Sequence, residues 1–176
     1  MKRKKFLAVL TFILIWTLLT FLFGDYVVNT LLGSWNGYLI MFIVSTFGGF
    51  SVFTGVSYFT TLILLSQTGL DPFLLGAAGG IGITFGDSFF FYLGLTGREA
   101  CDTPLRRKIQ QFSHFIRYKV SWAVPIFVFV YACVAPMPND VMTVSLGLAN
   151  YPFKKMVVPL LIGNIVFTTV VAIIFG

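Results

Sequence analysis

Two aspartates stand in otherwise apolar stretches, and they are the residues of this sequence best placed to do chemistry. Asp87 follows Gly86 among phenylalanines, and Asp140 follows Asn139 shortly after two prolines. At bilayer depth an unpaired carboxylate costs roughly 2.5 to 3.5 kcal/mol on insertion scales and is a functional candidate by default. Such a group can carry a proton or a cation or contact a substrate, but it can also bond interrupted backbone and only hold the fold. For Asp87 both interpretations stay open.

The two prolines, Pro136 and Pro138, interrupt the second long apolar stretch. Proline removes backbone donors, and irregular backbone is tolerated at membrane depth only where protein or water covers it. A half-helix starting at Asn139 could hold a phosphate headgroup at its N-terminus, whereas Asp140 as a capping carboxylate is the structural alternative. The candidate residues of a substrate or proton pathway are Gly86, Asp87, Pro136, Pro138, Asn139 and Asp140.

The elements that position these residues must be membrane helices. Of the 176 residues, 57% are hydrophobic, 18% aromatic and 10% charged, and the mean hydropathy is +0.92. A water-soluble domain needs more polar surface than this. The sequence therefore predicts an all-α, multi-pass integral membrane protein. Its single histidine and two cysteines argue against a metal site and a disulfide framework.

Residues 1–37 predict an N-terminal transmembrane helix followed by an external loop. Four basic residues precede an apolar run from Phe6 to Phe23, and no small-x-small cleavage site follows it. This pattern favours an uncleaved helix over a secretory signal. The segment from Gly24 to Gly37 carries an aspartate but no Lys or Arg, as a loop on the non-cytoplasmic side would.

Residues 38–97 predict a first re-entrant hairpin and a glycine-rich transmembrane helix. The apolar stretch from Tyr38 to Ser66 is interrupted by glycines. Each half reaches only about halfway across a ~30 Å hydrocarbon core at about 1.5 Å per residue. Asp71 and Pro72 then open a helix in which small residues at four-residue spacing allow close backbone packing. We expect this helix to be central; its glycines are Gly76, Gly79, Gly80, Gly82 and Gly86.

Residues 98–120 predict an amphipathic helix on the cytoplasmic membrane surface. Its apolar stripe at helical spacing is Leu105, Ile109, Phe112, Ile116 and Val120. His114 is expected to be solvated or interfacial. Basic residues of this segment could attract anionic headgroups or only anchor the topology; the headgroup candidates are Arg106, Arg107 and Lys108.

Residues 121–176 predict a second re-entrant hairpin, broken at the prolines, and a C-terminal transmembrane helix that starts near Pro152. If both interrupted stretches return to the side they left, all twelve Lys and Arg residues face one compartment. The positive-inside rule then places the N-terminus in the cytoplasm. Under this topology the two halves form an inverted repeat, the architecture of many secondary transporters. Each half carries a matching pair in its long helix, Gly86-Asp87 and Gly163-Asn164.

Several of these residues resemble the DedA family, also called SNARE-associated Golgi or VTT-domain proteins. Gly86-Asp87 with the later Tyr92 and Gly94 is similar to that family's Gly-Asp, Tyr, Gly signature, and further glycines and prolines fall at the spacing of its second hairpin and last helix: Pro136, Leu146-Gly147, Pro152 and Gly163. The chain departs from the family where Thr54-Gly55-Val56 replaces a Pro-Gly-Glu, and where Cys133 and Asn139 replace two arginines. The resemblance is thus to a divergent member.

The resemblance implies opposed re-entrant hairpins and a role in lipid handling. We therefore expect a plasma-membrane transporter or flippase that moves a polyprenyl phosphate or a phospholipid, with proton coupling left open. The alternatives are a proton- or cation-coupled small-solute exporter, which the missing arginines favour, and a non-transporting membrane scaffold. No catalytic constellation or cofactor motif is present, so an enzyme is the least expected class. The expected partners are membrane lipids and not nucleic acid, and a homo-oligomer stays open.

Overall fold

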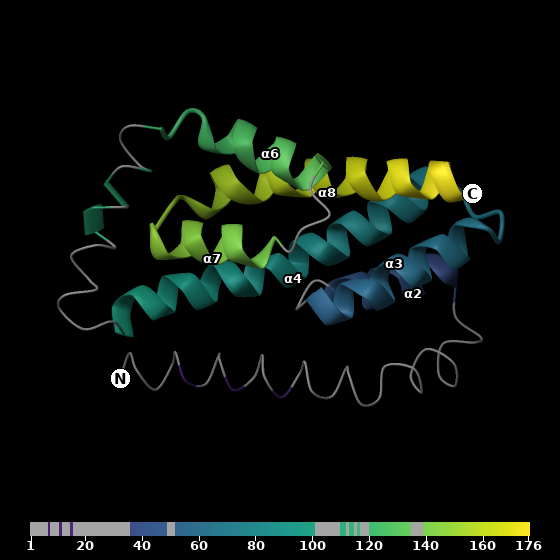
Figure 1. Ribbon diagram of the computed structural model, residues 1–176, viewed down its shortest axis with the longest axis horizontal. Helices are drawn as coiled ribbons and strands as arrows, with labels where there is room; N and C mark the ends of the chain where they lie inside the picture. The colour runs from purple at the N-terminus through teal and green to yellow at the C-terminus, as the bar shows by residue number, and fades with distance from the viewer. Residues whose placement is uncertain are drawn as a thin grey trace.

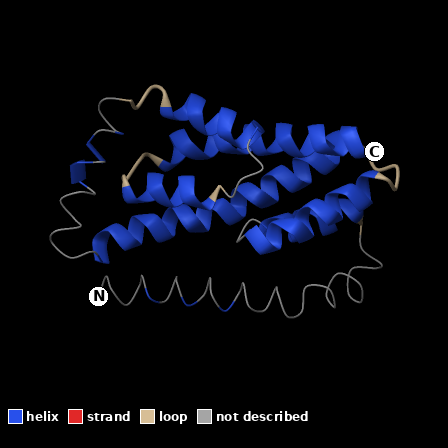
Figure 2. Cartoon of the chain, viewed as in Figure 1, coloured by secondary structure: helices blue, strands red, loops and turns tan. Residues whose placement is uncertain are grey.

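The structure is a computed structural model that describes residues 36–48, 52–100, 120–134 and 139–176, with single positions at Leu7, Thr11 and Ile15 and at 110, 111, 113, 114 and 116. Its ordered elements in these ranges are helices, without a strand (Figure 2). The helices are α2 (Gly37–Gly48), α3 (Val52–Ser66), α4 (Pro72–Ala100), α6 (Val124–Val134), α7 (Asp140–Leu148) and α8 (Phe153–Phe175). The prediction of an all-α protein is confirmed for this part of the chain.

Two of the helices, α4 and α8, are long and apolar enough to cross a bilayer. They contain 29 and 23 residues, which at about 1.5 Å per residue exceeds the ~30 Å thickness of a hydrocarbon core. Asp71 starts α4 as expected, since its Oδ1 accepts hydrogen bonds from the backbone N–H groups of Phe73 and Leu74 at 2.9 and 3.0 Å. Association with a membrane is therefore indicated by both composition and helix length.

The four short helices form two pairs at opposite ends of the long ones (Figure 1). Helices α2 and α3 contain 12 and 15 residues and pack against each other. Helices α6 and α7 contain 11 and 9 residues. Each pair runs toward the middle of the molecule and returns to the end from which it came (Figure 1). Each pair is therefore a helical hairpin about half as long as the helices beside it.

Glycines on α4 allow the neighbouring helices to pack against its backbone. All five of the glycines named for this helix are buried. A Cβ atom added at Gly80 would lie 2.6 Å from both the Cα and the N of Ile165 on α8, and one added at Gly82 would lie 2.6 Å from the carbonyl oxygen of Phe42 on α2. Gly94 is in similar contact with Val144 on α7. The prediction that this helix is central is confirmed.

Each hairpin has an apolar cluster of its own, and the long helices contribute to both. The first cluster joins α2, α3, α4 and α8 and contains Met41, Tyr58, Leu62, Leu75 and Ala172. The second joins α4, α6, α7 and α8 and includes Phe91, Val128, Leu146, Met156 and Leu160. The hairpins are thus fixed against the long helices separately, and α2 and α6 end, and α3 and α7 begin, near the middle of the molecule (Figure 1).

The predicted surface helix is described only at a few positions. Ile116 and Val120 are half-buried and pack against the second apolar cluster, whereas His114 is exposed. The hydroxyl of Ser113 donates a hydrogen bond of 2.6 Å to the carbonyl oxygen of Ala149. The described positions Ser113, Ile116 and Val120 therefore contact the helical bundle. The predicted N-terminal helix lies outside the described residues apart from single positions. Three stripe positions and the three headgroup candidates also lie outside them: Leu105, Ile109, Phe112, Arg106, Arg107 and Lys108.

Candidate functional site

Asp87 lies at the middle of α4 and is almost completely buried, with 1% of its surface exposed. Its Oδ2 accepts a hydrogen bond of 3.0 Å from the Nδ2 of Asn139, which directly precedes α7. The same oxygen accepts a longer bond of 3.5 Å from the Nδ2 of Asn164. Two of the predicted site residues, Asp87 and Asn139, are therefore in direct contact although 52 positions separate them in the sequence.

Asn164 occupies the middle of α8 and is 2% exposed. Its Oδ1 accepts a hydrogen bond of 3.1 Å from Asn139, and its Nδ2 donates one of 3.0 Å to the hydroxyl of Thr84 on α4. The side chain of Asn139 thus bridges the two long helices at their midpoints. We use the name polar cluster for Asp87, Asn139, Asp140 and Asn164.

A chain of hydroxyl groups connects the polar cluster to the first hairpin. Thr168 on α8 donates to the backbone carbonyl of Asn164 at 2.8 Å. Because this uses the only hydroxyl proton of Thr168, the hydroxyl of Tyr58 on α3 must be the donor in the 2.8 Å bond between the two side chains. Thr84 likewise donates to the carbonyl oxygen of Gly80 at 2.7 Å, so its oxygen is the acceptor for Asn164.

Three buried oxygen atoms in the polar cluster have no hydrogen-bond partner. They are Oδ1 of Asp87, Oδ1 of Asn139 and Oδ1 of Asp140. A buried polar atom left unpaired costs about 1 to 3 kcal/mol, and each exception in a structure calls for an explanation. Asp140 starts α7 directly after Asn139, whose amide contacts Asp87. The polar cluster is therefore rich in acceptors and contains a pair of acidic groups.

The expected capping role of Asp140 is wrong in its detail. The N-cap of α7 is Asn139, which makes no side-chain capping bond because its amide group points to Asp87 and Asn164. Asp140 occupies the first turn, where a carboxylate still interacts favourably with the helix dipole. Two unpaired acceptor oxygens at this N-terminus repel a phosphate group, so the predicted phosphate site at α7 lacks support.

The remaining candidates are placed only in part. Gly86 is buried next to Asp87, whereas Pro136 and Pro138 lie outside the described residues. The basic residues that the structure describes, Arg98, Lys154 and Lys155, lie near helix ends and not at the cluster. Within the described ranges no three His, Cys, Asp or Glu side chains gather as a metal site would require.

Sequence reasoning missed four residues that complete the site. Asn164 was recognised only as the partner of Asp87 in a repeated glycine-polar pair, and that pairing was the signal that could have assigned it to the site. Tyr58, Thr84 and Thr168 gave no signal of their own, because hydroxyl residues are scattered throughout the apolar stretches. Their role depends on which faces of the helices pack against each other, and the sequence alone does not determine those faces.

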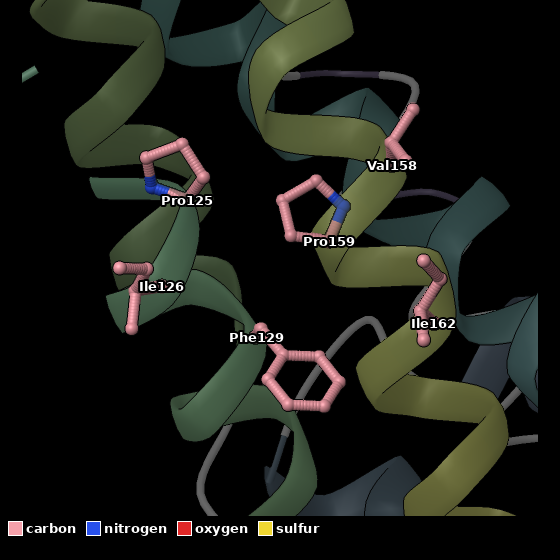
Figure 3. A pocket seen from close by; sticks show the side chains of 6 residues that line it. All are labelled: Pro125, Ile126, Phe129, Val158, Pro159 and Ile162. Atoms are coloured by element: carbon pink, nitrogen blue, oxygen red, sulfur yellow. The ribbon is translucent and has the colours of Figure 1, made fainter. Parts of the chain in front are cut away.

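A second feature is an apolar groove of about 320 Å³ between α6 and α8 (Figure 3). Its lining residues are Pro125, Ile126, Phe129, Val158, Pro159 and Ile162. They offer no polar side chain, and Ile126, Val158 and Ile162 are exposed. No pattern in the sequence predicts this groove. It can contact hydrocarbon but can do no chemistry of its own.

Comparisons of the chain with known protein-family models, with curated proteins and with solved structures found no match in any of the three.

Proposed function

We propose that this protein is a membrane transporter in which two re-entrant hairpins enter the bilayer from opposite faces and meet at the polar cluster. The observation that carries the proposal is the bridge made by Asn139, which joins Asp87 and Asn164 at the midpoints of both long helices. Broken helices that meet polar groups near the bilayer midplane are typical of secondary transporters. The short helices support this because each is too short to cross a ~30 Å core comfortably.

The described charges support a topology with the N-terminus in the cytoplasm. The end of α4 that carries Arg98 and the start of α8 with Lys154 and Lys155 lie at the same end of the molecule (Figure 1). Asp71 lies at the opposite end, where α4 starts. By the positive-inside rule the basic end faces the cytoplasm of a multi-pass plasma-membrane protein.

The cargo that we propose is a lipid moved between the two leaflets. The resemblance to the DedA family favours a polyprenyl phosphate or a phospholipid, and the chain would be a divergent member of that family. The apolar groove supports a lipid because it lies on the outer side of α6 and α8, where an acyl chain can reach it. The acceptor-rich cluster favours a phospholipid over a carrier recognised only through its phosphate.

A second candidate is a proton- or cation-coupled exporter of a small solute. It is favoured by the nearby carboxyl groups of Asp87 and Asp140, which have no basic partner among the described residues. Intramembrane carboxyl groups of this kind occur in proton and ion pathways.

Reconstitution of the purified protein into liposomes tests the first proposal. We expect a fluorescent phospholipid to equilibrate between leaflets faster than in empty liposomes, and Asp87→Asn to reduce that rate at least tenfold. Asp71→Asn is the matched control, because it makes the same change at an exposed position directly before the same helix. If the folded protein moves no lipid, the first proposal is contradicted. Ion-coupled flux of a small solute would then favour the exporter. If neither lipid nor solute moves, the protein is a scaffold.

A further inference from the structure

The polar cluster has no free hydrogen-bond donor but has unpaired acceptors. Both N–H groups of the Asn139 amide are used, on Asp87 and on Asn164. Both N–H groups of the Asn164 amide are used as well, on Thr84 and on Asp87. What stays unpaired is oxygen alone, one atom each on Asp87, Asn139 and Asp140. A ligand that completes this cluster must bring donors.

The cluster also lacks positive charge. Asp87 is 1% exposed, and a second acidic residue, Asp140, directly follows the Asn139 that contacts it. Among the described basic residues, Arg98 on the same helix lies roughly 16 Å away from Asp87 at about 1.5 Å per residue. Buried acidic groups are stabilised when a cation or a set of donors pairs with them. The ligand that fits best is therefore both a donor and a cation.

We propose that Asp87, Asn139 and Asp140 bind a primary ammonium group. An ammonium has three N–H donors and no acceptor, which matches three unpaired oxygens and offsets the acidic pair. A proton on one carboxyl group would supply a single donor for three oxygens, and a phosphate would supply further acceptors. This inference rests on the proposed transport function and specifies its substrate class. The ammonium belongs either to the headgroup of an aminophospholipid or to a soluble primary amine.

Binding is tested with the full chain in phosphatidylcholine nanodiscs at constant ionic strength. We expect ethylammonium chloride to raise the midpoint of thermal unfolding in a saturable manner, because a ligand that binds only the folded state stabilises it. Tetramethylammonium chloride, which has no N–H group, and sodium phosphate are the comparison probes and should give no such rise. Equal rises with either probe, or no rise with ethylammonium, overturn the proposal.

Variants assign the binding to the cluster. Asp87→Asn and Asp140→Asn should each weaken the apparent affinity for ethylammonium at least tenfold, whereas Asp71→Asn should leave it unchanged. Two separate variants are used, so that if one does not fold, the affinity of the other still tests the assignment. Unchanged affinity in every folded cluster variant places the ammonium elsewhere and overturns the assignment.

Proteoliposomes distinguish the two sources of the ammonium. An aminophospholipid substrate predicts that phosphatidylethanolamine changes leaflet at least fivefold faster than phosphatidylglycerol, and that ethylammonium inhibits this movement. Ethylammonium binding without lipid movement keeps the site, assigns it to a soluble amine and removes the lipid cargo. If lipid moves without headgroup preference and ethylammonium does not bind, the proposed lipid transport is supported and the proposed ammonium site is rejected.

Discussion

The two hairpins have similar arrangements, but their polar side chains are used differently. In the first hairpin the hydroxyls of Ser45 and Thr46 both donate to the carbonyl oxygen of Phe42 within α2, at 3.0 and 2.7 Å. The hydroxyl of Tyr58 on α3 donates to Thr168 on α8. These groups are occupied by intrahelical bonds or by a single contact between helices.

In the second hairpin, Asn139 and Asp140 each keep a buried oxygen without a partner. Asn139 at the same time makes the bridge between α4 and α8. Among the described residues of the two hairpins, the buried oxygens without a partner therefore lie in the second hairpin. Under the proposed function, we expect the first hairpin to act as support and the second to present the groups that a ligand contacts.

The largest expected effect on stability comes from the close contact of the two long helices. Gly80→Leu should lower the free energy of unfolding by more than about 3 kcal/mol, because its Cβ would lie 2.6 Å from backbone atoms of Ile165 and overpacking of this kind costs about 1–3 kcal/mol or more. Unfolding in detergent micelles, followed by circular dichroism, measures the change.

Gly55→Ala on α3 is the matched control. Nothing lies within 4 Å of a Cβ added at Gly55, and alanine favours a helix over glycine by about 1 kcal/mol. Stability should stay the same or rise by up to that amount. A similar loss for both substitutions would mean that α4 does not pack backbone to backbone with α8.

A smaller effect distinguishes the hairpins directly. Asn139→Leu removes the donors to Asp87 and Asn164 and should cost about 1.5 kcal/mol, near the upper end for hydrogen bonds between membrane helices. Lipid transport should fall at least tenfold. Thr46→Ala in the first hairpin removes only an intrahelical bond and should change neither quantity measurably; the same loss in both variants contradicts the difference drawn between the hairpins.

The smallest effect concerns the contact from the first hairpin to α8. Tyr58→Phe removes one hydrogen bond to Thr168 and should cost about 0.6 kcal/mol, the average measured between membrane helices. Transport should stay within twofold of the unchanged protein in the liposome assay. A tenfold loss of transport with intact stability would give the first hairpin a functional role that the structure does not indicate.

The sequence predicted the elements of this fold better than their contacts. The central position of the helix that begins at Pro72 followed from its glycine spacing, and the start of this helix followed from the Asp-Pro pair. These features are local, and small residues or a proline in the first turn have the same meaning in most contexts. The interruption near Pro136 and Pro138 was visible for the same reason.

The composition of the polar cluster depends on contacts between distant segments. Asp87 and Asn139 could be named as candidates because polar residues stand out in apolar runs, but their hydrogen bond depends on how α4 and α7 are rotated. Thr84 and Thr168 were not distinguishable from other hydroxyl residues, because only packing decides which threonine faces a neighbouring amide. The apolar groove has the same origin, since every residue that lines it is typical of a membrane helix.

The most direct test of the account is whether the turn of the second hairpin reaches the middle of α4 in a membrane. In a background without Cys101 and Cys133, the pair Asp87→Cys and Asn139→Cys is treated in native membranes with a short bifunctional thiol reagent. The pair Tyr58→Cys and Thr168→Cys, whose native side chains lie in hydrogen-bond contact, serves as a positive control. We expect both pairs to cross-link within one chain. Cross-linking of the control pair alone would contradict the account, because the bridge by Asn139 would then be missing.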